Sequence, residues 1–205
     1  MRMNFLDLMG QGNQSRDTSD TIYYLKTSTP HIHDIAVSGP YHDLESVHAQ
    51  ASHNFGSECS PGRSALEDFV RDGRHMAFEH IASPINGDPN RIKKTTLLRR
   101  QDAHLAAKLP CPVWNVVVSE LDSELKASGW AERNQMVPMK DMEIRQSYES
   151  EVAAKEKARE ILQELVSSNE GCTSRIMRQT PFQAGVLDGQ GPRFVVEVRY
   201  DGGLA

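Results

Sequence analysis

The stretch "DMEIRQSYESEVAAKEKAREILQELVSS" (141–168) decides the fold, because a segment of alternating polarity runs directly into an amphipathic one. Met142 and Ile144 alternate with polar residues, which is typical of a strand with one buried face. Ser150 is a good N-cap, and the apolar residues after it recur at helical spacing, so we predict a helix through about Ser167. Its apolar stripe consists of Ala154, Ala158, Ile161, Leu162 and Leu165. A strand followed by a long one-sided helix predicts an α+β protein.

A similar pattern occurs 107 residues earlier in the chain. Tyr41 and Asp43 precede one segment of helical periodicity, with the spacing at which Tyr148 and Ser150 precede the other. The earlier helix carries its apolar stripe on Leu44, Val47, Ala51 and Phe55, and Asp43 is its expected N-cap. The sequence therefore predicts a hairpin–helix unit that is used twice, with residues 35–55 superposing on residues 142–162.

The fold class that follows is α+β, with two ββαβ-type (hairpin–helix–strand) units whose antiparallel sheets pack against helices. Strands are expected at "TIYYLKTS" (21–28), "IHDIAVSG" (32–39), "RIKKTTLLRR" (91–100), "VWNVVVSEL" (113–121) and "RFVVEVRY" (193–200). We expect a flexible tail over 1–19, a first unit over 20–107 and a second unit over 108–205. A helical insertion over 57–90 includes a helix predicted at 65–81. The proline-containing "KLPCPV" (108–113) joins the two units.

Composition excludes several classes of protein. The 205 residues are 38% hydrophobic and 25% charged, as in a soluble globular protein, and the net charge of −5 argues against a general nucleic-acid binder. No apolar run reaches the ~18 residues of a membrane span. Three widely spaced cysteines with no secretory signal indicate reduced thiols, so we expect the protein in the cytoplasm, with the nucleus as the alternative.

The histidines are the first candidates for chemistry, since all eight lie within the first 104 residues. His31 and His33 are two residues apart, and on a strand they would project to the same face, as two ligands of one metal do. The known short metal-binding signatures are absent, however. We therefore predict no structural metal and no cofactor, with His31 and His33 at the start of a strand, on the surface or at the rim of a pocket.

His48 and two tyrosines are further candidates. His48 falls on the Leu44 side of its helix, where it is either a hydrogen-bonded histidine at the edge of the core or a pocket residue. Tyr41 and Tyr148 occupy matching positions just before the two helices, and they either pack in the core or line a cavity between the sheets. The candidates for acid–base catalysis are His31, His33, His48 and Tyr41, and Tyr148 is a candidate binding residue.

One run of the sequence is basic, with five cations and no acid over residues 91–100. Arg91, Lys93 and Lys94 are its candidate binding residues for nucleic acid or for an acidic partner. The alternative interpretation is a strand whose charged outer face discourages pairing between sheet edges. The negative net charge and the lack of interleaved aromatic residues favour this alternative.

Two functions from different classes follow. The first is a binding protein that contacts a protein partner or a second copy of itself through open sheet edges. The second is a small-molecule enzyme, cofactor-independent or metal-assisted, that performs isomerase- or cyclase-type acid–base chemistry in a His/Tyr pocket between the two units. An enclosed pocket reached by His31, His33 or His48 would favour the enzyme, and a solid core would favour the binding protein.

Overall fold

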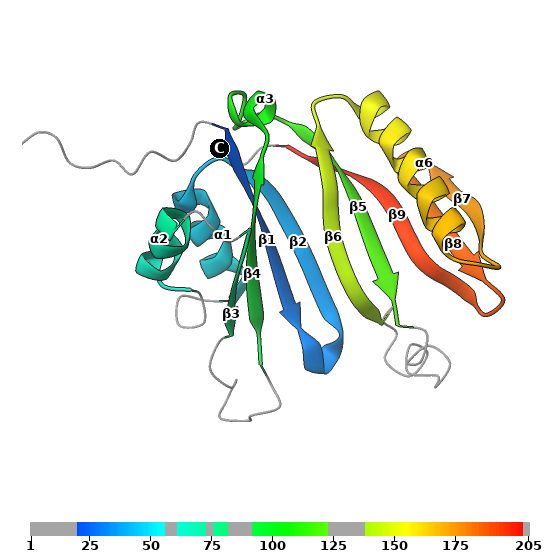
Figure 1. Cartoon of the computed structure of the whole chain (residues 1–205), viewed down its shortest axis with the longest axis horizontal. Helices are drawn as coiled ribbons and strands as arrows, with labels where there is room; N and C mark the ends of the chain where they lie inside the picture. The colour runs from blue at the N-terminus through cyan, green and yellow to red at the C-terminus, as the bar shows by residue number, and fades with distance from the viewer. Residues whose placement is uncertain (1–19, 56–60, 73–75, 82–91, 123–137, 203–205) are drawn as a thin grey trace, which may run out of the picture.

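The computed structural model of the chain describes residues 20–55, 61–72, 76–81, 92–122 and 138–202. It contains two antiparallel sheets with helices on their outer sides, which confirms the α+β class (Figure 1). The first sheet has the order β2-β1-β4-β3, from β1 (Thr21–Thr29), β2 (Asp34–Tyr41), β3 (Ala77–Ile81) and β4 (Lys94–Gln101). The second has the order β6-β5-β9-β8-β7, from β5 (Val113–Leu121), β6 (Met139–Tyr148), β7 (Thr173–Gln179), β8 (Phe182–Asp188) and β9 (Gly191–Asp201). The helices are α1 (Leu44–Phe55), α2 (Arg63–Asp72), α3 (Ala103–Ala106) and α6 (Glu151–Ser168), and a 3-10 turn, η1, spans Pro30–Ile32.

Among the described residues, three apolar clusters hold the layers together. Side chains on successive strand residues point to opposite faces, so β1 directs Tyr23 and Leu25 toward α1 and α2, and Ile22 and Tyr24 toward the second sheet. A separate cluster centred on Ala158 joins α6 to the outer face of the second sheet. The two sheets therefore pack face to face, with α1 and α2 at one end of the molecule and α6 at the other (Figure 1).

A buried hydrogen-bond network fixes the two sheets against each other. Ser147 Oγ donates to Asn115 Oδ1 at 2.5 Å, and Asn115 Nδ2 donates to the carbonyl oxygen of Gly39 at 2.7 Å. The Tyr24 hydroxyl lies 2.9 Å from Ser147 Oγ and donates a hydrogen bond to it, because the Ser147 proton is already donated to Asn115. Burial of these polar groups costs little free energy because each has a partner, and directional bonds restrict how the sheets can slide.

The two halves share their strand order. Sheet order β2-β1-β4-β3 in the first half corresponds to β6-β5-β9-β8 in the second, with β7 as an additional edge strand. Strands β2 and β6 end at Tyr41 and Tyr148, and helices α1 and α6 begin at Leu44 and Glu151, which preserves the offset of 107 residues. That the halves are copies of one unit, and the boundary between residues 107 and 108, stay predictions.

The helix predicted over 65–81 is wrong beyond Asp72, where α2 ends. Residues 77–81 instead form β3, which pairs with β4 and alternates exposed and half-buried side chains. Gly73 weakens a helix at this point, and the main-chain hydrogen bonds offered by β4 favour the strand. His80 therefore lies on a strand, whereas His75 lies outside the described residues.

The predicted strand position of His31 and His33 is also wrong. His31 lies in η1, which has proline at its first position, and His33 follows it with a positive φ of 52°. Proline presets the backbone for a helical turn, so the chain bends here before β2 begins at Asp34. The two imidazoles do not have the spacing of one strand face.

The basic run forms a strand as predicted, but the interpretation of its charges as protection of a sheet edge is wrong. The basic strand β4 lies between β1 and β3, so its charges do not protect a sheet edge. In the second half, β7 ends at Gln179 and β8 begins at Phe182, with a turn at Thr180 and Pro181 between them. The expected tail over 1–19 lies outside the described residues, as do residues 57–60, 73–75 and 82–90 of the insertion.

Candidate functional site

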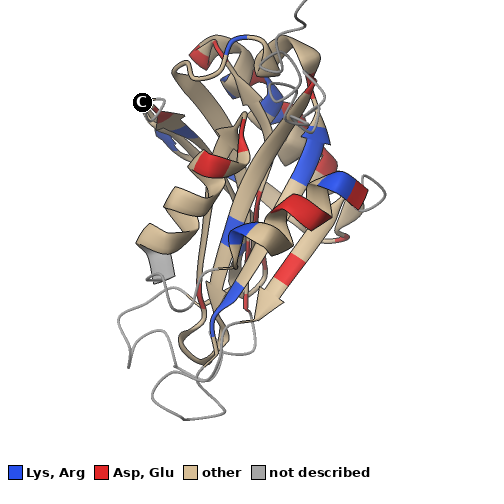
Figure 2. Cartoon of the chain, turned by 90° about the vertical axis from the view of Figure 1, so that its left-hand side faces the viewer, with Lys and Arg blue, Asp and Glu red and all other residues tan. Residues whose placement is uncertain are grey.

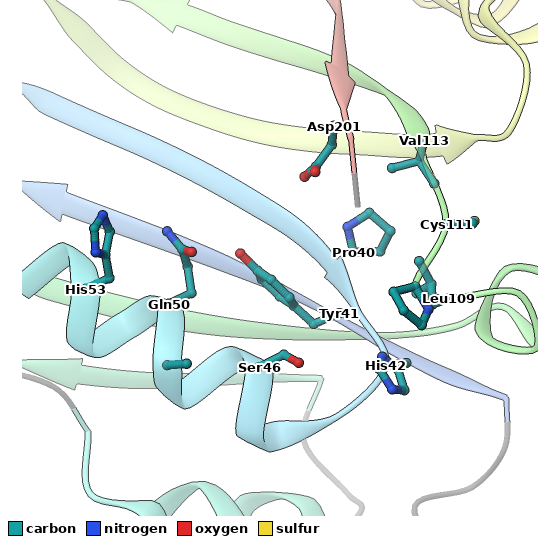
Figure 3. Close-up of a pocket in the computed structure, with 12 residues that line it drawn as sticks. Pro40, Tyr41, His42, Ser46, Gln50, His53, Leu109, Cys111, Val113 and Asp201 are labelled. Carbon is teal, nitrogen blue, oxygen red and sulfur yellow. The ribbon is translucent and has the colours of Figure 1, made fainter. Parts of the chain in front are cut away.

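A pocket of about 340 Å³ lies between α1 and the segment that connects the two halves (Figure 3). Its walls come from the end of β2, from α1, from the connecting segment and from the end of β9. The lining residues are Pro40, Tyr41, His42, Ser46, Ala49, Gln50, His53, Leu109, Pro110, Cys111, Val113 and Asp201. The volume falls in the range of about 300–1,000 Å³ that is usual for small-molecule sites.

Helix α1 supplies the polar wall. Ser46, Gln50 and His53 recur at i, i+4 and i+7, so they share one side of the helix and point toward the pocket (Figure 3). Asp43 begins the helix as predicted, because its carboxylate accepts hydrogen bonds from the backbone N–H of Ser46 at 2.7 Å and from the Ser46 hydroxyl at 2.9 Å. Ala49, on the same side, has the smallest side chain of this wall and leaves room for a ligand.

The same carboxylate contacts His42, which also lines the pocket. His42 Nε2 lies 3.0 Å from Asp43 Oδ2, and the imidazole is about two-fifths exposed. A carboxylate on one ring nitrogen sets the tautomer, so the proton of a neutral imidazole lies on Nε2 and Nδ1 is left as an acceptor. His42 is therefore the lining residue best arranged to exchange a proton with a bound molecule.

The opposite wall is largely apolar. Leu109, Pro110 and Val113 come from the connecting segment, and Val113 is buried at the start of β5. Val113 pairs with Asp201 in the ladder between β5 and β9, which brings the end of the chain's last described strand beside Tyr41 (Figure 3). Pro110 restricts the backbone of this wall, which lowers the entropy cost of ordering it around a ligand.

Tyr41 is the most buried polar residue of the lining. Burial raises the pKa of its hydroxyl above the ordinary value, and the negative charge of Asp201 raises it further, against a hydrogen bond with the Ser38 side chain. The phenol therefore stays protonated at neutral pH and acts as a hydrogen-bond donor or acceptor, not as a base.

Cys111 is the only thiol among the lining residues, and its surroundings disfavour the thiolate. Burial raises the pKa of Cys111, and the carboxylate of Glu149 adds to the rise, while Lys108 opposes it. A nucleophilic cysteine needs the reverse arrangement, with positive groups that stabilise the thiolate. The geometry thus favours a packing or contact role for this sulfur.

The raised pKa gives a testable pH dependence. In a variant with Cys59 and Cys172 replaced by serine, iodoacetamide can alkylate only Cys111. We expect the alkylation rate to increase with pH, and the midpoint of this increase to lie at a higher pH in the native protein than in the same protein in denaturant. The sign follows because a raised pKa moves thiolate formation to higher pH. The measurement is the rate–pH profile by mass spectrometry. A native midpoint at or below the denatured one would show a stabilised thiolate and would restore a nucleophilic role.

The charge of the lining narrows the ligand chemistry. Its twelve residues include one carboxylate, Asp201, and two histidines, His42 and His53, but neither lysine nor arginine. Phosphate and carboxylate groups are usually bound by Arg, Lys or helix N-termini. The arrangement therefore suits an uncharged or cationic molecule with hydrogen-bonding groups at one side and an apolar body at the other.

A second pocket, of about 380 Å³, lies at the other end of the sheets and includes His33 and Lys94. Its lysines face carboxylates: Lys26 pairs with Asp141, and Lys94 Nζ lies 3.7 Å from Glu79 Oε1. These pairs already satisfy the charged groups, so this pocket offers less to a ligand than the first.

The basic run is largely used within the fold. The guanidinium of Arg99 lies over the Phe69 ring at 5.1 Å from its centroid, and that of Arg100 lies over the Tyr24 ring at 4.9 Å. Positive and negative residues are interspersed over the face that Figure 2 shows. Lys93 is half-buried just before β4, and Arg91 lies outside the described residues.

The structure separates the other predicted site residues. His31 is exposed in η1, and His48 is half-buried on α1, outside the lining of both pockets. Tyr148 packs against the α6 cluster, where burial raises its pKa. Only Tyr41 of the predicted catalytic candidates lines the first pocket.

The sequence prediction missed most of the lining residues. Ser46, Gln50 and His53 carried a usable signal, since three polar residues at i, i+4 and i+7 mark one helix face next to the apolar stripe. The sequence around Cys111 and Asp201 gives no such signal, because these residues line the pocket only through the packing of one half on the other.

Two further observations concern the described part of the chain. Within it, no three His, Cys, Asp or Glu side chains come together as a group that could hold a metal ion. Nor does any helix in these ranges combine the length and the apolar character needed to cross a membrane.

Comparisons with models of protein families, with curated proteins and with solved structures found no match to this chain.

Proposed function

We propose that this protein binds a small, uncharged or cationic molecule in the pocket between α1 and the connecting segment. The observation that carries the proposal is the lining itself, with hydrogen-bonding side chains on the α1 wall and apolar side chains on the opposite wall. Ligand sites typically combine a mostly apolar surface with a few oriented polar groups.

Binding is better supported than catalysis. The protonated phenol of Tyr41 and the disfavoured thiolate of Cys111 are poor as a base and as a nucleophile. They serve well as hydrogen-bonding and contact groups. The imidazole of His42 lies against the carboxylate of Asp43, so any proton transfer on a bound molecule would run through this imidazole.

A titration with three matched aromatic probes tests the proposal. Phenol is neutral, benzylammonium is cationic and benzoate is anionic, and all three are small enough for the pocket. We expect phenol and benzylammonium to shift the NMR signals of the His42 and His53 imidazoles at low millimolar concentration, and benzoate to shift them less.

An Ala49→Trp variant is the matched control. Ala49 is exposed on the pocket side of α1, so an indole there fills the pocket without disturbing the buried face of the helix. The variant should keep the melting temperature of the parent protein and lose the probe-induced shifts. Shifts that persist in the variant, or a preference for benzoate, would contradict the proposed site.

A further inference from the structure

Strand β7 forms the outer edge of the second sheet, beyond β8 (Figure 1). Each of its seven residues is exposed, including Ile176 at 44% and Met177 at 47%. An antiparallel strand with one neighbour directs alternate backbone N–H and C=O groups away from the sheet, where they can accept another strand. Within the described ranges, no strand occupies that side.

The middle of this edge is apolar. Charged side chains and bulges usually protect a sheet edge from pairing. Strand β7 has two arginines and a register shift, but the residues between the arginines are the apolar Ile176 and Met177. The side chain of Met177 lies over Gly185 of β8, beside Leu187, so the apolar surface continues onto the sheet. The register with β8 shifts between Ile176 and Arg178, which leaves Thr173–Ile176 as the regular part of the edge.

The arginines of β7 differ from the others in the described residues. Arg175 and Arg178 take part in no ion pair, side-chain hydrogen bond or ring contact there. Each remaining described arginine has such a partner: Arg63, Arg71, Arg99, Arg100, Arg145, Arg159, Arg193 and Arg199. No acidic residue lies in β7. Two unpartnered guanidinium groups beside an open strand edge suit carboxylates on an added strand.

We propose that the β7 edge binds an extended acidic segment of another protein as an added antiparallel strand. Backbone hydrogen bonds along Thr173–Ile176 would supply part of the affinity, and Arg175 and Arg178 would select acidic side chains. A second copy of this chain is the poorer partner, because its own β7 would bring the same two positive charges to the interface. This proposal does not depend on the pocket.

The test uses three heptapeptides blocked at both ends. One alternates glutamate and valine, one alternates lysine and valine, and the third is the glutamate peptide methylated at alternate backbone nitrogens. We expect the glutamate peptide to bind the full chain and to slow hydrogen exchange in β7. The other two peptides should bind at least about tenfold more weakly.

Charge reversal sharpens the test. The double variant Arg175→Glu and Arg178→Glu should lose the glutamate peptide and bind the lysine peptide. Arg63→Glu with Arg71→Glu, on α2, makes the same change of net charge at two exposed positions and should retain the original preference.

Three results would overturn the proposal. The first is the absence of β7 protection at about 1 mM glutamate peptide, a concentration at which even weak strand addition is populated. The second is equal binding of the methylated peptide, which would exclude backbone pairing. The third is a dimer of the parent protein that the β7 reversal dissociates, which would assign the edge to a second copy of the chain.

Discussion

An Ala158→Asp variant is expected to melt roughly 10 °C or more below the parent protein, or to fail to fold. Ala158 has no exposed surface and lies where α6 meets the second sheet. A carboxylate there would be buried without a partner, at a cost of about 3–5 kcal/mol against a total stability of about 5–15 kcal/mol. Because Ala158 is small, helix and sheet lie close together at this position and leave no room for a larger side chain.

Val152→Asp is the matched control on the same helix. Val152 is 66% exposed in the first turn of α6, where a carboxylate also interacts favourably with the helix dipole. Its melting temperature should stay within a few degrees of the parent protein. A comparable melting temperature for Ala158→Asp would show that this face of α6 is not buried.

A Gly39→Ala variant should also be strongly destabilised, by about 3 kcal/mol or more. Gly39 has a φ of +112°, which side chains rarely adopt, and an added Cβ would lie 2.7 Å from the carbonyl oxygen of Tyr23. The residue also accepts the hydrogen bond from Asn115 that joins the two sheets. Any backbone shift that relieves the contact disturbs that bond.

Two other glycines separate the effect of backbone strain from the effect of the close contact. Gly171 has a φ of +75° but open space where a Cβ would be, so Gly171→Ala should cost only about 1 kcal/mol from backbone strain. Gly189 has neither feature, and Gly189→Ala should be close to neutral. Urea titrations of the three variants give the comparison. Equal losses at Gly39 and Gly171 would show that the close contact contributes nothing.

The sequence predicted the elements that local periodicity determines. The helix α6 begins at Glu151 after Ser150, as expected, although the Ser150 side chain makes no capping hydrogen bond. Asp43 does cap α1. Strand β9 buries Val196 and Val198 as its alternation indicates, although Tyr200, in the same alternating series, is 61% exposed. These elements have long, one-sided apolar patterns, and such patterns hold in most tertiary contexts.

Elements that depend on a neighbour were harder to predict. Residues 77–81 form a strand because β4 lies beside them, whereas Gly73 by itself only weakens the helical pattern that contains Leu66 and Phe69. His31 and His33 lie in a turn because Pro30 begins it. A pocket was expected between the two halves, with His31, His33 or His48 in it. The first pocket contains His42 and His53 instead, because the packing of α1 directs His53, and His42 just before the helix, toward it. Single-sequence patterns do not contain that packing.

Reversible disulfide trapping at Cys111 tests the ligand pocket most directly. Protein with serine at Cys59 and Cys172 is equilibrated with a set of small thiol-reactive disulfides, and mass spectrometry identifies those retained. A second protein with serine at Cys59 and Cys111 presents Cys172, which packs at the edge of the α6 cluster, as the control. We predict that Cys111 retains neutral and cationic aromatic fragments that Cys172 does not, and that Ala49→Trp abolishes the selection. The same fragments on both thiols, or selection unchanged by Ala49→Trp, would contradict a ligand site in this pocket.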